Sequence, residues 1–369
     1  MDLTTFFAGV PDFRLNRRKK HQLVDILGIA LLAIVSGADD FEEIEAYGKR
    51  KEPFLRTFLA LANGVPSHDT FNRVFKFMDK DAFGACLYTW SRELLSFLEE
   101  KMPHFNLDGK VLRATAKAGA KKSGICIVSA WVAEQQLVLG QETVAAKSNE
   151  KTAIPQLIKS LDLPGALVSC DAAGCQASNA ALIVEGQGDY LLAIKKNQKH
   201  AYEQLSEWME ERKGTLPVDE WIDFGSGRIE KRRCYVENQL ELLDGLAGWP
   251  DLKSVVMVES QREKLGKMTI ETRFYLSSLE ARPAQFNKLV RNHWSIENQL
   301  HWRLDVVFRE DMSRTRQGNA PQNMATARKM ALQLLGQVQD KQSMKNRRKM
   351  AGWDDEYLLE VVKGIFKCV

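Results

Sequence analysis

The order of apolar segments between residues 105 and 194 is the feature that most limits how this chain can fold. The predicted elements are strands at 105–108, 125–132 and 137–144, a helix at 154–161, a strand at 166–170, a helix at 177–184 and a strand at 190–194. Three strands are thus followed by alternating helices and strands. This order predicts an α/β architecture built on a mixed sheet.

The same order is similar to the ribonuclease H arrangement, in which the first and fourth strands are neighbours. From about 216 to 279 the pattern returns to strands, and the best candidates lie at 234–237, 253–259 and 272–277. A helix that begins at Pro283 then resumes the earlier rhythm, because proline needs no amide hydrogen bond in the first turn of a helix. We therefore expect a ribonuclease H-like mixed sheet with a β-rich insertion at about 216–279.

Residues 1–100 carry helical periodicity and no convincing strand pattern, which predicts a small all-helical N-terminal domain. A basic run from Arg14 to Lys20 followed by the apolar stretch 26–38 imitates a secretory signal. The stretch starts late, is too short to span a bilayer and opens behind Asp25, so we expect a buried helix there and no membrane segment.

Charge and cysteine content narrow the class of protein further. The 369 residues include 52 basic and 48 acidic side chains, so the net charge of +4 favours an anionic partner only weakly. The basic residues at 341–349 predict a basic helical tail over 341–369, and they form either a solvated face or an outer contact with such a partner. The six cysteines form no CxxC pair and are interpreted as reduced cytosolic thiols.

Three acids stand out as candidate metal ligands. Asp108 and Asp171 each end an apolar strand-like run, and Glu297 lies in the polar stripe Trp294–Asp305 of the late helix. Taken singly, each is also compatible with a turn or a helix surface. Together on one predicted fold, they indicate metal-dependent phosphodiester chemistry, because two Mg²⁺ or Mn²⁺ ions require hard oxygen ligands held at fixed positions.

Basic, amide and aromatic side chains near these acids are candidate DNA contacts. Consecutive donors at the end of a strand suit a nucleic-acid backbone, and Trp294 is either a core residue or a stacking surface for an unpaired base. The candidate DNA-binding residues are Lys110, Arg113, Lys195, Lys196, Asn197, Gln198, His293, Trp294, Asn298, His301, Arg314 and Arg316.

A zinc site competes for the late helix. His293, Glu297 and His301 recur every four residues and so lie roughly on one helix face. Eight residues at a rise of about 1.5 Å put the two histidines roughly 12 Å apart along the axis. One tetrahedral Zn²⁺ cannot reach both, although one histidine and Glu297 could share a metal.

Seven segments spread along nearly the whole chain carry a specific resemblance. They are Val10–Arg14, Ser67–Thr70, Asp108–Arg113, Lys147–Glu150, Asp171–Gln176, Gly188–Gln198 and Asn292–Asp305. In these segments the chain resembles insertion-sequence transposases of the DDE class, and within them the H-repeat-associated proteins.

This resemblance implies a transposase-associated helical domain at 1–100, a ribonuclease H-like DDE catalytic domain at 101–340 and the tail at 341–369. It implies DNA transposition by Mg²⁺-dependent strand cleavage and strand transfer, with the three acids at Asp108, Asp171 and Glu297. It also implies a homo-oligomer assembled on the DNA of the element ends and target, at the nucleoid in the bacterial cytoplasm.

The chain departs from the broader family around its third acid. Val290 and His293 stand seven and four residues before Glu297, where Tyr and Arg are expected, and Leu304 stands where Lys is expected. This pattern resembles the H-repeat subgroup, which includes immobile relics. The alternative function is therefore a relic that acts only as a DNA-binding or regulatory protein.

Overall fold

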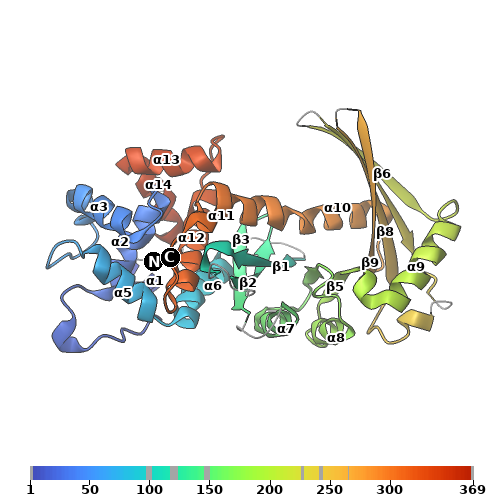
Figure 1. The fold of residues 1–369 in the computed structure, drawn as a ribbon, viewed down its shortest axis with the longest axis horizontal. Coiled ribbons are helices and arrows are strands. Elements are labelled where there is room, and N and C mark those ends of the chain that lie inside the picture. Colours follow the sequence, from blue (N-terminus) through green and yellow to red (C-terminus); the bar gives the residue numbers. More distant parts are fainter. Residues whose placement is uncertain are drawn as a thin grey trace.

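A nine-stranded mixed sheet forms the middle and one end of the elongated molecule in the computed structural model (Figure 1). The structure describes residues 3–96, 102–116, 124–144, 150–225, 228–240, 244–264 and 266–366. The strands are β1 (His104–Leu112), β2 (Ile125–Val132), β3 (Leu137–Thr143), β4 (Leu167–Cys170), β5 (Asp189–Ile194), β6 (Val218–Gly225), β7 (Arg228–Glu237), β8 (Ser254–Lys264) and β9 (Lys267–Ser277).

The strand order is β3-β2-β1-β4-β5-β9-β8-β7-β6. Strands β1, β2 and β3 are antiparallel neighbours, whereas β4 lies parallel to β1 and β5 lies parallel to β4. The expected adjacency of the first and fourth strands is therefore confirmed. The strands of the predicted insertion, β6 to β9, continue the same sheet, because β9 pairs antiparallel with β5.

Helices cover both faces of this sheet. α7, α8 and α9 pack on one face through residues such as Leu157, Ile183 and Leu205. α10 packs on the other face through Phe286 and Val290. The helices of this half are α7 (Glu150–Ser160), α8 (Ala177–Glu185), α9 (Lys199–Arg212), α10 (Pro283–His293) and α11 (Trp302–Val306), with a π-helical turn, η5 (Ile296–His301), between the last two.

The opposite end of the molecule is helical (Figure 1). Its helices are α1 (Leu3–Phe6), α2 (Leu23–Val35), α3 (Phe41–Arg50), α4 (Glu52–Leu55), α5 (His68–Phe77), α6 (Lys80–Ser96), α12 (Ala320–Gly336), α13 (Met344–Trp353) and α14 (Asp355–Phe366). The N-terminal helices share one apolar core with α12, α13 and α14. The predicted C-terminal tail thus packs onto the N-terminal helices.

The apolar stretch that imitates a secretory signal forms α2, which is buried from Asp25 to Val35. The expectation of a buried helix is therefore confirmed. None of the helices in the described ranges is long and apolar enough to cross a bilayer. The described cysteines are all free thiols.

Some predicted boundaries differ from the structure. β1 does not end at Asp108, because Gly109 to Leu112 continue to pair with β2. α7 begins at Glu150, four residues before the prediction, and carries Pro155 in its interior. β7, β8 and β9 are longer than predicted, and β6 was missed, because their outer halves are exposed and place polar residues between apolar ones such as Phe224 and Ile270.

Candidate active site

One face of β1 and β4 carries the first two acids. Alternate residues of a strand share a face. Asn106 and Asp108 therefore point the same way on β1. Ser169 of β4 points the same way as Asp171, which is the first residue after β4. Ser169 Oγ donates a hydrogen bond to Asn106 Oδ1 at 3.0 Å, which places both residues on this common face. Asn106 of β1 pairs with Ser169 of β4, and Asp108 and Asp171 each lie two residues further along the sequence.

Burial and neighbouring acids act together on Asp108. Burial is the largest cause that raises the pKa of Asp108 to about 7, and the charges of Asp171, Glu297 and Glu150 act in the same direction, against a hydrogen bond from the Gly109 amide. A nearby carboxylate has this effect because it disfavours the charged form of its neighbour. The negative charges of Asp171, Glu297 and Glu150 thus act on Asp108 in this structure.

Glu297 lies in the π-helical turn η5 and is exposed. The three residues that recur every four positions differ in exposure: His293 is buried, His301 is half-buried and Glu297 is exposed. His301 Nδ1 lies 3.4 Å from Asp108 Oδ2.

His293 belongs to a buried polar cluster beneath the acids. Ser169 Oγ lies 2.9 Å from His293 Nδ1 and 2.8 Å from His104 Nε2. Because Ser169 donates its one proton to Asn106, both histidines must donate to its oxygen. Burial lowers the pKa of His293 to about 4 and that of His104 to about 3, so both are neutral. His293 is therefore removed from the candidate DNA contacts and supports the fold of the site.

His301 is held in its neutral form beside Asp108. Burial lowers its pKa to about 3, and the charges of Lys329 and Lys110 contribute. Lys329 of α12 is itself buried, and its Nζ donates to Ser129 Oγ and Gln141 Oε1, each at 2.7 Å. Ser129 is the ladder partner of Asp108 on β2. His301 thus contacts an acid of the site and is not available to a DNA base.

Glu150 is a site residue that the chemical reading of the sequence missed. It opens α7, and Cys126 Sγ donates to its Oε1 at 3.4 Å. A Cβ atom added to Gly109 would collide with the Glu150 carboxylate, so the glycine allows this carboxylate to approach β1 closely. The motif Lys147–Glu150 marked the segment, but no pattern in it indicated that its acid reaches β1.

Lys110 does not face solvent as a DNA contact would. Its Nζ lies 2.6 Å from Asp305 Oδ1, 3.1 Å from Glu310 Oε2 and 3.4 Å from Asp311 Oδ1. Its side chain is only 10% exposed, and Glu310 is almost fully buried. Lys110 therefore pairs with all three acids and ties β1 to α11 and the segment after it.

The segment 195–198 divides into two pairs. Lys195 and Lys196 are exposed after β5, and no described residue pairs with either ammonium group. Asn197 Nδ2 donates to the Ala172 carbonyl at 2.9 Å, and Gln198 Nε2 donates to the Cys175 carbonyl at 3.0 Å. The two lysines are free to contact phosphate, whereas the two amides hold the loop that follows Asp171.

The remaining candidates lie at different depths. Asn298 and Arg314 are exposed, and Arg113 is exposed with Asp311 3.4 Å from its Nε. Arg316 is exposed and donates to the Ala114 carbonyl at 2.6 Å. Trp294 is half-buried: its Nε1 donates to the Tyr275 hydroxyl at 3.2 Å, and the Arg273 guanidinium lies 3.9 Å from its ring centroid. Arg273 therefore covers one face of the Trp294 ring, so this ring cannot stack bases on both faces.

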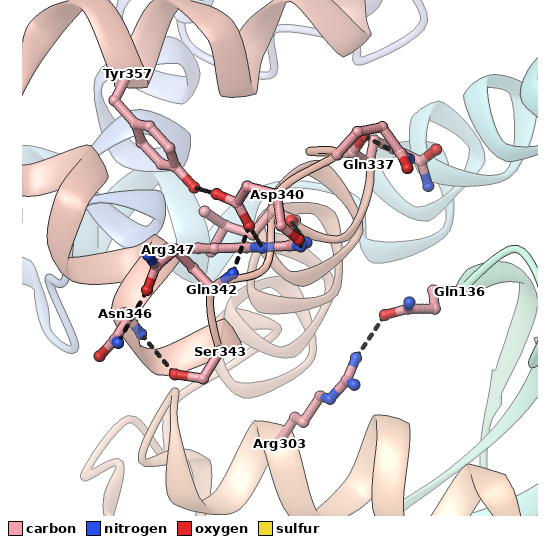
Figure 2. Close-up of polar contacts among 11 residues, drawn as sticks. Gln136, Arg303, Gln337, Asp340, Gln342, Ser343, Asn346, Arg347 and Tyr357 are labelled. Carbon is pink, nitrogen blue, oxygen red and sulfur yellow. Dashed lines mark hydrogen bonds and ion pairs between the residues drawn. The ribbon is translucent and has the colours of Figure 1, made fainter.

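Two arginines of the basic run 341–349 are structural. Arg347 donates to Asp340, whose other oxygen accepts from Tyr357 at 2.7 Å, as Figure 2 shows. Figure 2 also shows Arg303 of α11 bonded to Gln136, which ties α11 to the turn before β3. Arg348 is buried and donates to backbone carbonyls of Ile34 and Ala38. Of the basic side chains in this run, Lys341, Lys345 and Lys349 are the ones that are exposed.

The described acids of the candidate site do not form a compact group of metal ligands in this structure. Among the residues that the structure describes, no three His, Cys, Asp or Glu side chains stand together as metal ligands. The zinc arrangement is disfavoured in addition, because His293 is buried and bonded to Ser169, whereas Glu297 is exposed.

Comparisons with known proteins agree with this geometry. Residues 99–334 match the family model described as "Transposase DDE domain", and residues 4–91 match the one described as "DDE_Tnp_1-associated". The chain is 36% identical to "Putative transposase YncI" of Escherichia coli O157:H7, over 98% of this chain and 94% of that protein. It is 34% identical to "H repeat-associated putative transposase YhhI" of Escherichia coli (strain K12), over 96% of each.

A further relative is 41% identical over 75% of this chain and 95% of its own length. It is the "Uncharacterized protein in dhlA 3'region" of Xanthobacter autotrophicus. The resemblance to H-repeat-associated transposases is therefore confirmed along almost the full chain.

Proposed function

This chain belongs to the transposase DDE domain family, and we propose that it cleaves DNA at the ends of an insertion sequence and transfers the cleaved strand to a target. The observation that carries the proposal is the match of residues 99–334 to the transposase DDE domain, within which β1, with Asp108, pairs with β4, which is followed by Asp171. The strand order around β1 and β4, which matches the expected ribonuclease H-like core, supports it further.

We assign Asp108, Asp171 and Glu297 as the residues that would hold a divalent metal. The donor set fits such an ion, because carboxylate oxygens are the ligands that Mg²⁺ and Mn²⁺ prefer. The excess negative charge also calls for a cation, since Lys110 is already engaged by three other acids. The chemistry that two such ions supply when bound is activation of the attacking oxygen and stabilisation of the leaving one.

The chain's own residues would orient the acids and the substrate. Asp108 keeps Oδ1 on the Gly109 amide and Oδ2 towards His301, which restricts its rotation. Asp171 accepts from the Ala173 amide at 2.9 Å, and Asn197 holds the same loop. Lys195 and Lys196 at the end of β5 would contact DNA phosphates beside the acids, together with Arg113 and Arg314.

Cleavage of DNA that carries the flanking element ends tests the proposal. The purified protein should nick these ends with Mg²⁺ or Mn²⁺ and should lose cleavage in EDTA. Asp108→Ala, Asp171→Ala and Glu297→Ala should each abolish cleavage and retain DNA binding, because the phosphate contacts come from separate lysines and arginines.

Retained cleavage in Asp171→Ala would remove this residue from the site. Cleavage restored by Zn²⁺ alone would point to histidine ligands. Binding of the ends without cleavage under any of these metals would favour the relic that only binds DNA. Assembly of a homo-oligomer on DNA and location at the bacterial nucleoid stay predictions.

A further inference from the structure

One face of α13 presents two lysines and a tryptophan to solvent. Lys345, Lys349 and Trp353 recur every four residues and therefore lie along one side of the helix. Trp353 is 75% exposed, although tryptophan is usually well buried. Lys349 Nζ lies 5.9 Å from the Trp353 ring centroid. The stripe is too apolar at its tryptophan end to be an ordinary solvated helix face.

This stripe forms one wall of a pocket of about 600 Å³. The opposite wall comes from α11 and the segment after it, where Val306 and Met312 are also exposed. A volume of this size is within the range of small-molecule sites in proteins. The pocket therefore offers an apolar floor and an aromatic ring at its rim.

The walls of the pocket are fixed in place. Arg348, on the inner side of α13, donates to the Ala38 carbonyl and to Asp39 Oδ1 at 2.9 and 2.8 Å. A Cβ atom added to Gly352 would collide with the Ser36 carbonyl oxygen, so α13 packs directly on the end of α2. The pocket is thus preformed, which lowers the entropic cost of binding.

The charge of the lining suits an anion. Lys345, Lys349 and Arg309 supply cations, and Arg309 is paired with Asp39, whose Oδ2 lies 3.8 Å from its Nη1. Among the described lining residues the one acid is Asp305, and Lys110 occupies its carboxylate at 2.6 Å. Lys110 lies two residues after Asp108 on β1, so the pocket adjoins the acid site.

We propose that this pocket binds single-stranded DNA, with phosphates on Lys345 and Lys349 and an unpaired base stacked on Trp353. Lysines alone would suit duplex DNA equally well. An exposed ring beside apolar side chains favours an unpaired base, because the base faces of a duplex are stacked against each other and are not accessible. The inference rests on the proposed function only in that the ligand is DNA near the cleavage site.

The test is the binding of a fluorescein-labelled 12-mer of thymidine, followed by anisotropy in EDTA at several salt concentrations. Trp353→Leu should weaken binding roughly 5- to 150-fold, as loss of one stacked aromatic ring does, and Trp353→Phe should retain most of the affinity. Lys345→Ala combined with Lys349→Ala should lower the slope of log affinity against log salt by up to about 1.4, since each phosphate contact on a single strand contributes about 0.7.

The matched control combines Lys159→Ala and Lys267→Ala, which removes two exposed lysines of α7 and β9 and the same net charge. It should leave the slope nearly unchanged. Thermal unfolding checks that each variant is folded, which we expect because all five side chains are exposed.

Equal affinity of Trp353→Leu and the unchanged protein for the 12-mer would overturn the proposal. So would an equal loss of affinity for the 12-mer and for its duplex with the complementary strand, because the ring would then not recognise an unpaired base. EDTA keeps this assay independent of cleavage. If the protein did not cleave DNA but still bound the 12-mer in a way that depends on Trp353, this result would contradict only the proposed function.

Discussion

His301 Nδ1 lies 3.4 Å from Asp108 Oδ2, on the same π-helical turn that carries Glu297. One local irregularity therefore supplies both an acid of the candidate site and a contact to another acid. The four-residue spacing keeps these two side chains on roughly the same side of the turn. Glu297 is exposed there, whereas His301 is largely buried against Asp108.

Replacement of His301 should therefore impair cleavage without unfolding the chain. Outer-shell partners of metal-binding carboxylates typically change affinity or activity by about 10- to 100-fold. We expect His301→Ala to lower the cleavage rate by this order and to raise the Mg²⁺ concentration needed for half-maximal rate. His301→Asn, which keeps a donor, should recover part of the loss. A rate and Mg²⁺ dependence equal to those of the unchanged protein would exclude a positioning role.

The raised pKa of Asp108 predicts how stability depends on pH without metal. Its folded-state pKa of about 7 lies above the ordinary 3.8, so its contribution is fully present below about pH 4 and is lost as pH rises through 7. The loss is at most about 4 kcal/mol. Urea unfolding from pH 5 to 8.5 should show this fall, and Asp108→Asn, which stays neutral, should lack it. The same fall in the variant would contradict the shift.

Mg²⁺ should oppose this loss. Protons compete with a cation for the Asp108 carboxylate, so the metal-induced rise in unfolding temperature should be larger at pH 8 than at pH 5.5. Asp108→Asn should show a smaller rise at pH 8. A rise that does not depend on pH in the unchanged protein would indicate that the ion binds elsewhere.

The contact between Gly109 and Glu150 predicts a pairwise coupling. Gly109→Ala forces the Glu150 carboxylate away, and because this carboxylate ends a flexible side chain that can rotate, the cost should be at most about 1 kcal/mol. In a Glu150→Ala background the same glycine substitution should cost much less, because the colliding atoms are gone. Urea unfolding of the four proteins gives the coupling free energy. Equal costs in both backgrounds would show that another contact selects glycine.

Arg348 should be important for stability and not for DNA binding. It is buried, and its guanidinium donates to carbonyls of α2 and the loop after it as well as to Asp39. Loss of a buried, bonded charge typically costs about 3–5 kcal/mol. Arg348→Ala should therefore lower the free energy of unfolding by this order, whereas Lys345→Ala, on the exposed face of α13, should change it by less than about 0.5 kcal/mol.

The sequence predicted the parts of the fold whose patterns are local. Helix α8 and strand β5 lie within one residue of the predicted ranges, since each is bounded by glycine or a polar turn. The end of β1 was predicted wrongly, because Asp-Gly is a common turn signal and only the pairing of Gly109–Leu112 with β2 overrides it. Non-local pairing of this kind leaves no trace in a short window.

The roles of the side chains could likewise be predicted where they depend on local sequence, and not where they depend on distant contacts. The three acids could be selected from their positions after strands and in the late helix. The burial of Lys110 could not be predicted, because its partners Asp305, Glu310 and Asp311 lie some 200 residues away. Nor could the burial of His293, because its partner Ser169 lies 124 residues away in the sequence.

Lys195 and Lys196 differ from Lys110 in a way that salt titration can measure. The first two are exposed without a described partner, whereas Lys110 is held by three acids. Each phosphate contact on duplex DNA contributes about 0.9 to the slope of log affinity against log salt, so removing Lys195 and Lys196 together should lower the slope by up to about 1.8. Preference for the element ends should persist, because phosphate contacts do not read bases. Lys110→Ala should leave the slope unchanged and destabilise the fold, since three clustered carboxylates would lose the cation with which they pair. A lower slope with unchanged stability in Lys110→Ala would show that this lysine reaches the DNA.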